Sequence, residues 1–395
     1  MFQLDLAPAD PILGLTETFN ADTHPDKINL GVGVYQDATG KTPILKAVTQ
    51  AETHLLENES SKGYLSIPGI PELATHTQEL LFGAGHEIIQ EGRAKTAQTP
   101  GGTGALRVAA DFLLRAAPKA TVWLSNPSWA NHQAIFEAAG FPVRDYRYYN
   151  EASQGLDGEG FMADLEGVAE GDIVILHACC HNPSGIDLDQ AAWEAIATQA
   201  KAKNVVCLVD FAYQGFGEGL EEDRAGLHIL LNAGLSVLVV SSFSKNFSLY
   251  GERIGAITVV EETANDAFNA FSHVQAAIRA IYSSPPAHGG KIVATILGDA
   301  QLKELWIQEL AEMRSRIKAM RRAFVQGMTD RQQMVDFDFI NHQKGMFSFS
   351  GLTLKQVLKL RADNHIYIVD SGRINVAGIT PTNIDPLCDA VSRVL

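Results

Sequence analysis

The residues whose types and spacing best suggest chemistry lie at positions 242–255, which read SFSKNFSLYGERIG. Lys245 follows an apolar run at 235–240, has hydroxyl residues on both sides, and precedes Arg253 by eight positions. Lysine is the side chain that forms a Schiff base with an aldehyde cofactor. Serine hydroxyls beside it and a forked guanidinium nearby suit a phosphate group. Taken alone, Lys245 is far more typical of a surface charge after a core strand, so its interpretation depends on the rest of the chain.

This run resembles the cofactor-lysine signature of the class I pyridoxal-phosphate aminotransferases, and the resemblance covers essentially the whole chain. Within that family the chain is most similar to the bacterial aspartate aminotransferases, a subgroup that also includes the aromatic-amino-acid enzymes. The resemblance implies pyridoxal 5'-phosphate as cofactor. It also implies an α/β fold of type I, with a large domain built on a mainly parallel seven-stranded sheet between helices and a smaller α+β domain.

An aspartate, Asp210, ends a second apolar run at 205–209. Open α/β sheets contact their ligands at the carboxyl ends of their strands. An aspartate at such an end can keep a pyridine nitrogen protonated, so that the ring acts as an electron sink. Tyr213 lies three residues later and can reach the phenolic oxygen of the ring, and the resemblance assigns Asn182 to the same oxygen. Taken alone, Asp210 could simply cap the following loop.

A metal site is the alternative interpretation of the His177, Cys179, Cys180 and His181 cluster, which follows a predicted strand at 172–176. Adjacent cysteines bind one ion poorly, and no second CxxC or HxxxH pair follows them. We therefore expect no metal.

A glycine-rich segment at 98–108 fits a phosphate cradle, because a helical pattern begins directly after the glycines and a helix N-terminus offers free N–H groups and a favourable dipole. Two competing phosphate motifs fail. Arg107 occupies the position where a dinucleotide fingerprint needs glycine or alanine, and Tyr35 occupies the position where a P-loop ending in Gly40-Lys41-Thr42 needs glycine.

Composition agrees with a two-domain enzyme, since 395 residues exceed what one core usually serves. The net charge of −15, without a basic run, argues against nucleic-acid and anionic-membrane partners. Four cysteines give no disulfide framework, and residues 1–8 do not read as a signal peptide. No apolar stretch approaches the ~18 residues of a membrane span. We expect a cytoplasmic protein.

The periodicity places alternating strands and helices between about 95 and 260, followed by helices and short strands. We expect an N-terminal arm at 1–10, a small domain formed by 11–42 with 313–395, and a large cofactor-binding domain at 43–312. The predicted strands are 121–124, 172–176, 205–209, 235–240, 254–260, 346–349, 366–369 and 374–376, and the predicted helices include 188–201, 301–328, 354–362 and 381–395.

The resemblance assigns a role to each matching residue. Lys245 would hold the cofactor and shuttle the proton, with Asp210 and Tyr213 as its catalytic partners and His132 supporting Asp210. Arg373 would bind the substrate α-carboxylate, and Arg279 from the partner chain would bind a side-chain carboxylate. The remaining implied cofactor contacts are Gly102, Thr103, Trp129, Asn182, Ser242, Ser244, Arg253 and the partner's Tyr64; the remaining implied substrate contacts are Gly33, Trp129 and Asn182. Cis peptide bonds are implied at Asn126–Pro127 and Asn182–Pro183.

The implied reaction is transfer of the amino group of L-aspartate to 2-oxoglutarate in a ping-pong sequence, in a homodimer with shared active sites that binds amino acids and 2-oxo acids. Two bidentate arginines would orient the substrate so that C–H rather than C–COO⁻ is broken. Gly63 and Ser284 replace a polar residue and an asparagine of the common family pattern near the substrate, so a broad aromatic-amino-acid aminotransferase remains the alternative. A cofactor-binding regulatory protein is disfavoured, because there is no helix-turn-helix extension.

Overall fold

A computed structural model describes residues 13–332 and 335–395, so the predicted arm at 1–10 lies outside the described residues. The chain divides into two compact units. The smaller unit is formed by the N-terminal segment that ends at Thr42, by residues 183–185 and by Arg316–Leu395. The larger unit is formed by Pro43–Asn182 and Ile186–Ser315. Helix α12, Ala300–Asp330, contributes residues to both units.

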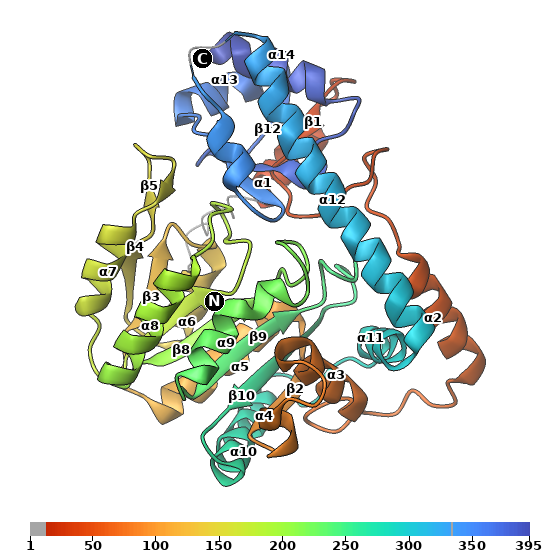
Figure 1. Cartoon of the computed structure of the whole chain (residues 1–395). Coiled ribbons are helices and arrows are strands. Elements are labelled where there is room, and N and C mark those ends of the chain that lie inside the picture. Colours follow the sequence, from red (N-terminus) through yellow and green to blue (C-terminus); the bar gives the residue numbers. More distant parts are fainter. Residues whose placement is uncertain (1–12, 333–334) are drawn as a thin grey trace, which may run out of the picture. The chain divides into compact units, whose positions relative to one another are not determined.

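The larger unit is built on a seven-stranded sheet with the strand order β2-β10-β9-β8-β7-β3-β4 (Figure 1). Neighbours from β9 to β4 are parallel, and β10 is antiparallel to both β2 and β9. The expected mainly parallel seven-stranded sheet is confirmed. The strands are β2 Ala94–Pro100, β3 Val122–Asn126, β4 Val143–Arg147, β7 Ile173–His177, β8 Val206–Phe211, β9 Val237–Ser242 and β10 Ile254–Val260.

The central strands are the ones that their sequence predicts. Strands β9 and β10 are buried along their whole length, which is the apolar pattern of a sheet covered on both faces. The two edge strands were not predicted. Strand β2 reads AKTAQTP and β4 reads VRDYR, and these polar sequences form strands because each pairs along one side with an apolar neighbour.

Helices cover this sheet. Helix α5 packs on β9 and β10 and contacts α6 and α10, whereas α8 contacts α7 and α9. Helices α8 and α9 lie side by side in front of the sheet in Figure 1. The remaining elements of this unit are a short hairpin of β5 Tyr149–Asn150 and β6 Gly155–Leu156, and helices α2 Lys46–Asn58, α3 Pro71–Phe82, α4 Glu87–Gln90, α5 Gly101–Ala116, α6 Ala130–Ala139, α7 Gly158–Glu166, α8 Gln190–Lys203, α9 Ala225–Asn232, α10 Ala264–Ile281 and α11 His288–Gly298.

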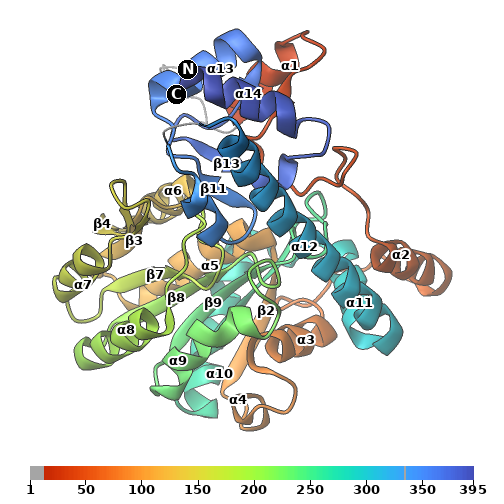
Figure 2. The same ribbon diagram turned by 45° about the horizontal axis from the view of Figure 1, so that its top comes forward.

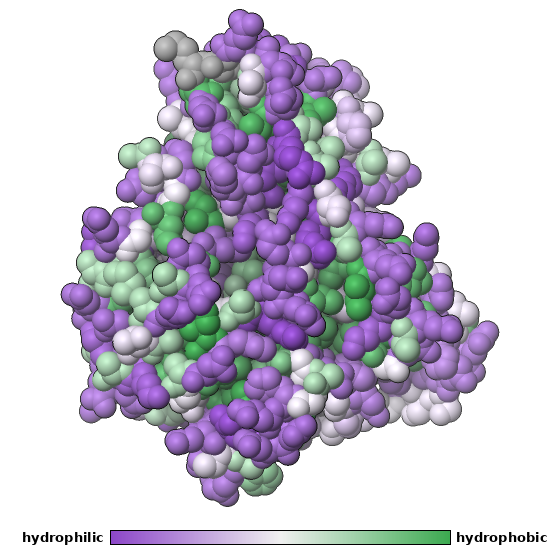
Figure 3. All heavy atoms as spheres, in the orientation of Figure 1, coloured by the Kyte–Doolittle hydropathy of each residue, from purple (hydrophilic) through white to green (hydrophobic). Residues whose placement is uncertain are grey.

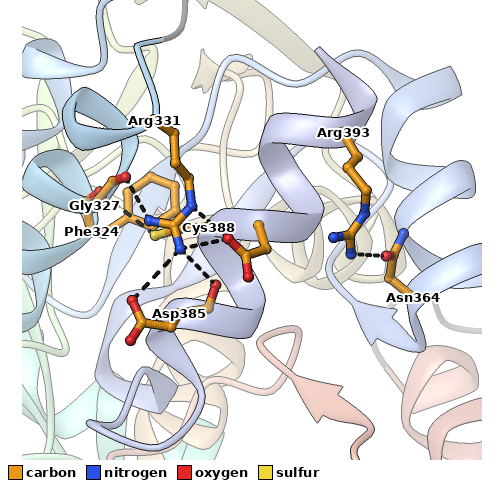
Figure 4. A network of polar contacts seen from close by, with 8 residues as sticks. Phe324, Gly327, Arg331, Asn364, Asp385, Cys388 and Arg393 are labelled. Atoms are coloured by element: carbon orange, nitrogen blue, oxygen red, sulfur yellow. Dashed lines mark hydrogen bonds and ion pairs between the residues drawn. The ribbon is translucent and has the colours of Figure 1, made fainter.

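The smaller unit combines short strand pairs with helices (Figure 2). Strand β1 pairs in parallel with β12, and β11 pairs antiparallel with β13. Near the end of α12, Arg331 contacts Asp385 and Asp389 of α14 (Figure 4), with an Nε–Oδ1 distance of 2.8 Å to Asp389. The elements are α1 Leu13–Ala21, β1 Ile28–Asn29, β11 Phe347–Phe349, α13 Leu354–Asn364, β12 Ile366–Tyr367, β13 Arg373–Asn375 and α14 Ile384–Val394.

Polar side chains cover most of the face drawn in Figure 3, with smaller apolar areas between them. Among the described residues, no helix combines the length and the apolar character needed to cross a lipid bilayer.

Candidate active site

Lys245 lies three residues beyond the carboxyl end of β9 and is partly buried. Its Nζ lies 4.8 Å from the centroid of the Tyr213 ring. Burial lowers the pKa of the Lys245 ammonium and the Arg253 charge lowers it further, while the Asp210 carboxylate acts in the opposite direction. A lysine with a lowered pKa keeps a larger fraction of its amine neutral, and the neutral amine is the nucleophilic and basic form.

Asp210 is the penultimate residue of β8, and its carboxylate is buried beside the same region. Its Oδ2 accepts a hydrogen bond from His132 Nε2 at 2.9 Å, and His132 Nδ1 lies 2.9 Å from Ser128 Oγ. Burial raises the pKa of Asp210, but the hydrogen bond and the charge of His132, together with His177 and Lys245, outweigh burial, so the net pKa is lowered. Asp210 therefore holds a stable negative charge. Its other oxygen, Oδ1, accepts no hydrogen bond within the described parts of the chain.

Behind Asp210, buried rings form a continuous chain of contacts that the sequence did not predict. The His132 and His177 ring centroids are 5.2 Å apart, and those of His177 and His181 are 4.3 Å apart. His181 stacks at 4.0 Å on Tyr148 and lies 2.9 Å from Ser125 Oγ. Burial, followed by the nearby His132, lowers the pKa of His177 to about 3. No local pattern in the sequence indicates these contacts, which arise because His177 and Asp210 face each other on neighbouring strands.

The residues considered above as a metal cluster have other surroundings. Cys179 and Cys180 are buried thiols, and the Cys180 and His181 backbone N–H groups donate to the Asp187 carboxylate. Within the residues that the structure describes, no group of three or more histidine, cysteine, aspartate or glutamate side chains could hold a metal ion.

An anion cradle lies at the start of α5. Strand β2 ends at Pro100 and the helix begins at Gly101, so the expected glycine loop is reduced to a single turn with φ +72° at Gly101. A Cβ on Gly101 would lie 2.9 Å from Arg253 Cζ, and a Cβ on Gly102 would lie 3.2 Å from Ser242 Cβ. Side chains would therefore fill this space, which glycine leaves open.

Two serines and an arginine complete the cradle. Arg253 Nη1 donates to Ser244 Oγ at 3.3 Å, and the Ser244 N–H donates to Ser242 Oγ at 3.3 Å. Both serines are buried, whereas Arg253 is exposed and has φ +53°. Thr103 lies in the first turn of α5. The helix N-terminus, the hydroxyls and the guanidinium together suit a phosphate dianion.

Trp129 is the residue before α6, and its ring meets the His132 ring edge-on at a centroid distance of 5.3 Å. It follows the Asn126–Pro127 peptide bond, which is cis as predicted. The prediction of a second cis bond at Asn182–Pro183 is wrong, because that bond is trans. Trans is the isomer that an X–Pro bond favours by about 0.5–1 kcal/mol, and the sequence around Asn182 carries no local signal against it. Asn182 itself is buried.

Tyr64 and Arg279 are both exposed in the single chain, and the side chain of Tyr64 is fully exposed. Arg279 lies in the last turn of α10, where its Nη1 donates to Ser283 Oγ. Ser283 adopts the left-handed conformation with φ +69°. Neither residue contacts the Lys245 and Asp210 group within the described chain.

Arg373 and Gly33 belong to the smaller unit and both lie against one aromatic ring. The Arg373 guanidinium lies 4.2 Å from the centroid of Phe347 and donates to the Gly31 carbonyl at 2.6 Å. A Cβ on Gly33 would lie 2.9 Å from Phe347 Cζ. The structure therefore gathers the predicted residues into two groups, one in each unit, with Tyr64 and Arg279 outside both.

Known proteins resemble this chain along its whole length. The family "Aminotransferase class I and II" matches residues 25–391. The aspartate aminotransferases of Salmonella typhi and Escherichia coli are 54% and 53% identical to the chain over 396 residues, covering 100% of each protein. An aromatic-amino-acid aminotransferase from Burkholderia pseudomallei, solved covalently bound to pyridoxal phosphate, superposes with a TM-score of 0.97 at 49% identity over 99% of this chain and 98% of that one. Since the family match and the full-length identity agree with the arrangement of Lys245, Asp210 and the anion cradle, the chain belongs to the class I and II aminotransferase family.

Proposed function

We propose that this chain is a pyridoxal-phosphate-dependent aminotransferase that moves the amino group of L-aspartate to 2-oxoglutarate, forming oxaloacetate and L-glutamate. One observation carries the proposal: the carboxyl ends of β8 and β9 bring a lysine, a buried charged aspartate and an anion cradle into one region. The substrate assignment follows from identities of 49–54% to four bacterial aspartate aminotransferases.

The residues present fit the cofactor. A phosphate monoester needs several hydrogen-bond donors close together. The N-terminus of α5, Ser242, Ser244 and Arg253 offer such donors. A protonated pyridine nitrogen needs a charged acceptor, which Asp210 Oδ1 offers because only Oδ2 is taken by His132. Trp129 would lie against the ring. Gly102 and Thr103 would contact the phosphate, and Tyr213 and Asn182 would bind the phenolic oxygen.

Lys245 has two successive tasks in this proposal. Its amine would hold the cofactor aldehyde. Once the substrate amine has taken its place, the freed Lys245 amine would remove the proton from the substrate Cα and deliver it to the cofactor carbon that is bonded to the substrate nitrogen. The bound cofactor supplies a ring that accepts the electron pair left by that proton. Asp210 keeps its negative charge through both tasks because His132 donates to it and Ser128 orients His132.

Substrate recognition in the proposal rests on two arginines. Arg373 would bind the α-carboxylate with Gly33 alongside it, and the partner's Arg279 would bind the side-chain carboxylate. Two bidentate contacts restrict rotation about Cα and thereby select which bond is broken. The full exposure of Tyr64 and the exposure of Arg279 support a homodimer in which both serve the site of the other subunit.

The larger and smaller units are proposed to be the cofactor-binding domain, 43–312, and the small domain, 11–42 with 313–395. We place the enzyme in the cytoplasm, because its four cysteines are all free thiols.

A broad aromatic-amino-acid aminotransferase is the second candidate, favoured by the relatives with that activity, including one from Pseudomonas aeruginosa at 44% identity over 387 residues. A panel of amino acids with 2-oxoglutarate tests both. The main proposal expects kcat/KM for aspartate to exceed that for phenylalanine; the reverse order would favour the second candidate. Absence of transamination with every amino acid would refute both.

A further inference from the structure

Gln98 is a buried polar side chain at one edge of the seven-stranded sheet. It lies on β2, the edge strand next to β10, and is 1% exposed. It occurs three residues before Gly101, where the anion cradle begins. A buried amide on an edge strand requires partners for all of its hydrogen-bonding groups.

Two segments from elsewhere in the chain provide those partners. From the 66–70 turn, Pro68 O accepts from the Gln98 backbone N–H at 2.9 Å, and the Ile70 N–H donates to Gln98 Oε1 at 3.3 Å. From the turn after α10, Pro286 O accepts from Gln98 Nε2 at 2.7 Å, and the Tyr282 hydroxyl donates to the Gln98 carbonyl at 3.1 Å. A single residue therefore fastens both turns to one strand.

The packing around Gln98 leaves no free space. A Cβ on Gly69, which has φ +88°, would lie 2.5 Å from Gln98 Cβ, and a Cβ on Gly290 would lie 2.5 Å from Gln98 Nε2. Close packing of this kind transmits small displacements instead of absorbing them. The position of Gln98 is thus defined from two sides by backbone.

The two fastened turns adjoin the two exposed residues assigned to the partner's site. Tyr64 lies between α2 and the 66–70 turn, and Arg279 lies three residues before Tyr282. The other end of the Tyr64 segment is held separately, because Glu59 pairs with Lys62 and with Lys291 of α11. Gln98 is hydrogen-bonded to both the Tyr64 and the Arg279 segment, which also approach each other directly at Gly69 and Pro285.

We propose that Gln98 is a positioning residue that acts in trans: it holds the Tyr64 and Arg279 segments of its own chain in place for the active site of the partner subunit. The inference rests on the proposed function, which supplies the shared sites. It goes beyond that function by naming a buried residue, without contact to substrate or cofactor, as a determinant of the neighbouring site.

Mixed dimers with differently tagged chains test the direction of the effect. One chain carries Arg279→Ala and keeps Lys245; the other carries Lys245→Ala and keeps Arg279, so the only complete site takes its lysine from the first chain and its arginine from the second.

Gln98→Met preserves the length of the side chain and removes both of its hydrogen bonds. Placed on the arginine-donating chain, it should lower kcat/KM for aspartate roughly tenfold to a hundredfold, and placed on the lysine-donating chain it should change kcat/KM less than about twofold. Both dimers contain one Gln98→Met chain, so a general folding defect would appear equally in both. Equal losses, a larger loss in the lysine-donating placement, or no loss in either would overturn the proposal.

Hydrogen exchange provides a second readout that needs no activity. In the Gln98→Met homodimer, amides of 59–70 and 279–286 should exchange at least about tenfold faster than in the wild type, while those of 237–242 stay unchanged. Gln78→Met is the matched control, because Gln78 Nε2 also binds β2, at Thr96 Oγ1 (3.1 Å), without contacting either turn. Unchanged exchange in both segments would overturn the proposal. The reference is the mixed dimer in which both chains keep Gln98. If this dimer is inactive, the active sites are not shared between subunits, and Gln98 cannot act in trans.

Discussion

His132 Nε2 donates to Asp210 Oδ2 at 2.9 Å while His132 Nδ1 lies 2.9 Å from Ser128 Oγ. Since the ionised carboxylate can only accept, this geometry assigns a proton to Nε2, and the Ser128 hydroxyl, which can both donate and accept, holds the other ring nitrogen. One oxygen of Asp210 is thereby occupied, and the other remains for a ligand. The pair explains how a carboxylate that burial would tend to protonate keeps its charge.

Lys245→Ala should abolish turnover while preserving the fold. The same amine holds the cofactor and moves the Cα proton, so its loss should lower kcat on the order of 10⁴-fold, the upper range for a general base. Stopped-flow and steady-state assays with aspartate measure the loss, and the cofactor content after dialysis checks that the anion cradle still binds. Activity within tenfold of the wild type would contradict the role of Lys245.

Asp210→Asn keeps the shape of the side chain and removes its charge. Hydrogen bonds to charged groups contribute about 1.5–3 kcal/mol, so kcat/KM should fall roughly 10-fold to 150-fold. Ser128→Ala is the graded comparison, because it keeps the charge of Asp210, removes a hydroxyl that among the described residues contacts only the neighbouring His132 and His177 rings, and should cost less than Asp210→Asn. An Asp210→Asn enzyme that is no worse than Ser128→Ala would mean that the charge at position 210 is not used.

The stability of the protein should fall as the pH drops below 6.5, partly because of His177. Its pKa is about 3 in the folded protein, chiefly through burial, against an ordinary 6.5. Since the folded pKa is the lower one, only the unfolded chain takes up this proton between pH 6.5 and 3. From pH 8 to pH 5, His177 therefore reduces the free energy of unfolding by about 2 kcal/mol.

His177→Gln tests this pH dependence. In urea unfolding at pH 8 and pH 5, at one protein concentration, the variant should lose about 2 kcal/mol less than the wild type between the two pH values. The exposed His273 provides a control substitution, His273→Gln. The same pH dependence in His177→Gln and wild type would contradict a neutral, desolvated His177.

Arg279→Ala should discriminate between substrates. A charged contact that the substrate buries is worth on the order of 2–5 kcal/mol when one partner is removed. The activation free energy for aspartate should rise by that amount, so kcat/KM should fall strongly for aspartate and much less for phenylalanine. Parallel steady-state assays measure the ratio. Equal losses for both substrates would show that Arg279 is structural.

Ser283 should affect the ratio of kcat/KM for aspartate to kcat/KM for phenylalanine in the same direction as Arg279, but more weakly. Its hydroxyl accepts from Arg279, and its φ of +69° is one that glycine and asparagine adopt readily. Ser283→Gly therefore keeps the backbone and removes the acceptor, whereas Ser283→Asn keeps both. We expect Ser283→Gly to lower the aspartate preference a few-fold, about the value of one exposed hydrogen bond, and Ser283→Asn to restore it. No difference between the two variants would exclude this hydrogen bond as a determinant of specificity.

Homodimers of Lys245→Ala chains and homodimers of Arg279→Ala chains should complement each other. With random pairing, half of the dimers are mixed and half of their sites carry neither change, so about a quarter of the wild-type aspartate activity should return after subunit exchange. Tagged chains verify the exchange. If verified exchange restores no activity, Arg279 acts within its own chain or not at all.

The sequence alone determined the local features of the site. An apolar run followed by Lys245 predicted β9 and the lysine beyond it, and the glycines at 101–102 predicted the α5 N-terminus, because burial, periodicity and backbone freedom depend on neighbouring residues. The tertiary structure alone decided the contacts between distant positions. The polar sequence of β2 forms a strand only because β10 pairs with it, and Gln98 has partners 28 to 188 residues away. The edge-on contact of His177 with His132 likewise depends on distant segments, because His177 lies at the end of β7, level with Asp210 of β8, and His132 lies on α6. Such contacts form only when the folded chain brings these residues together, and no local pattern encodes them.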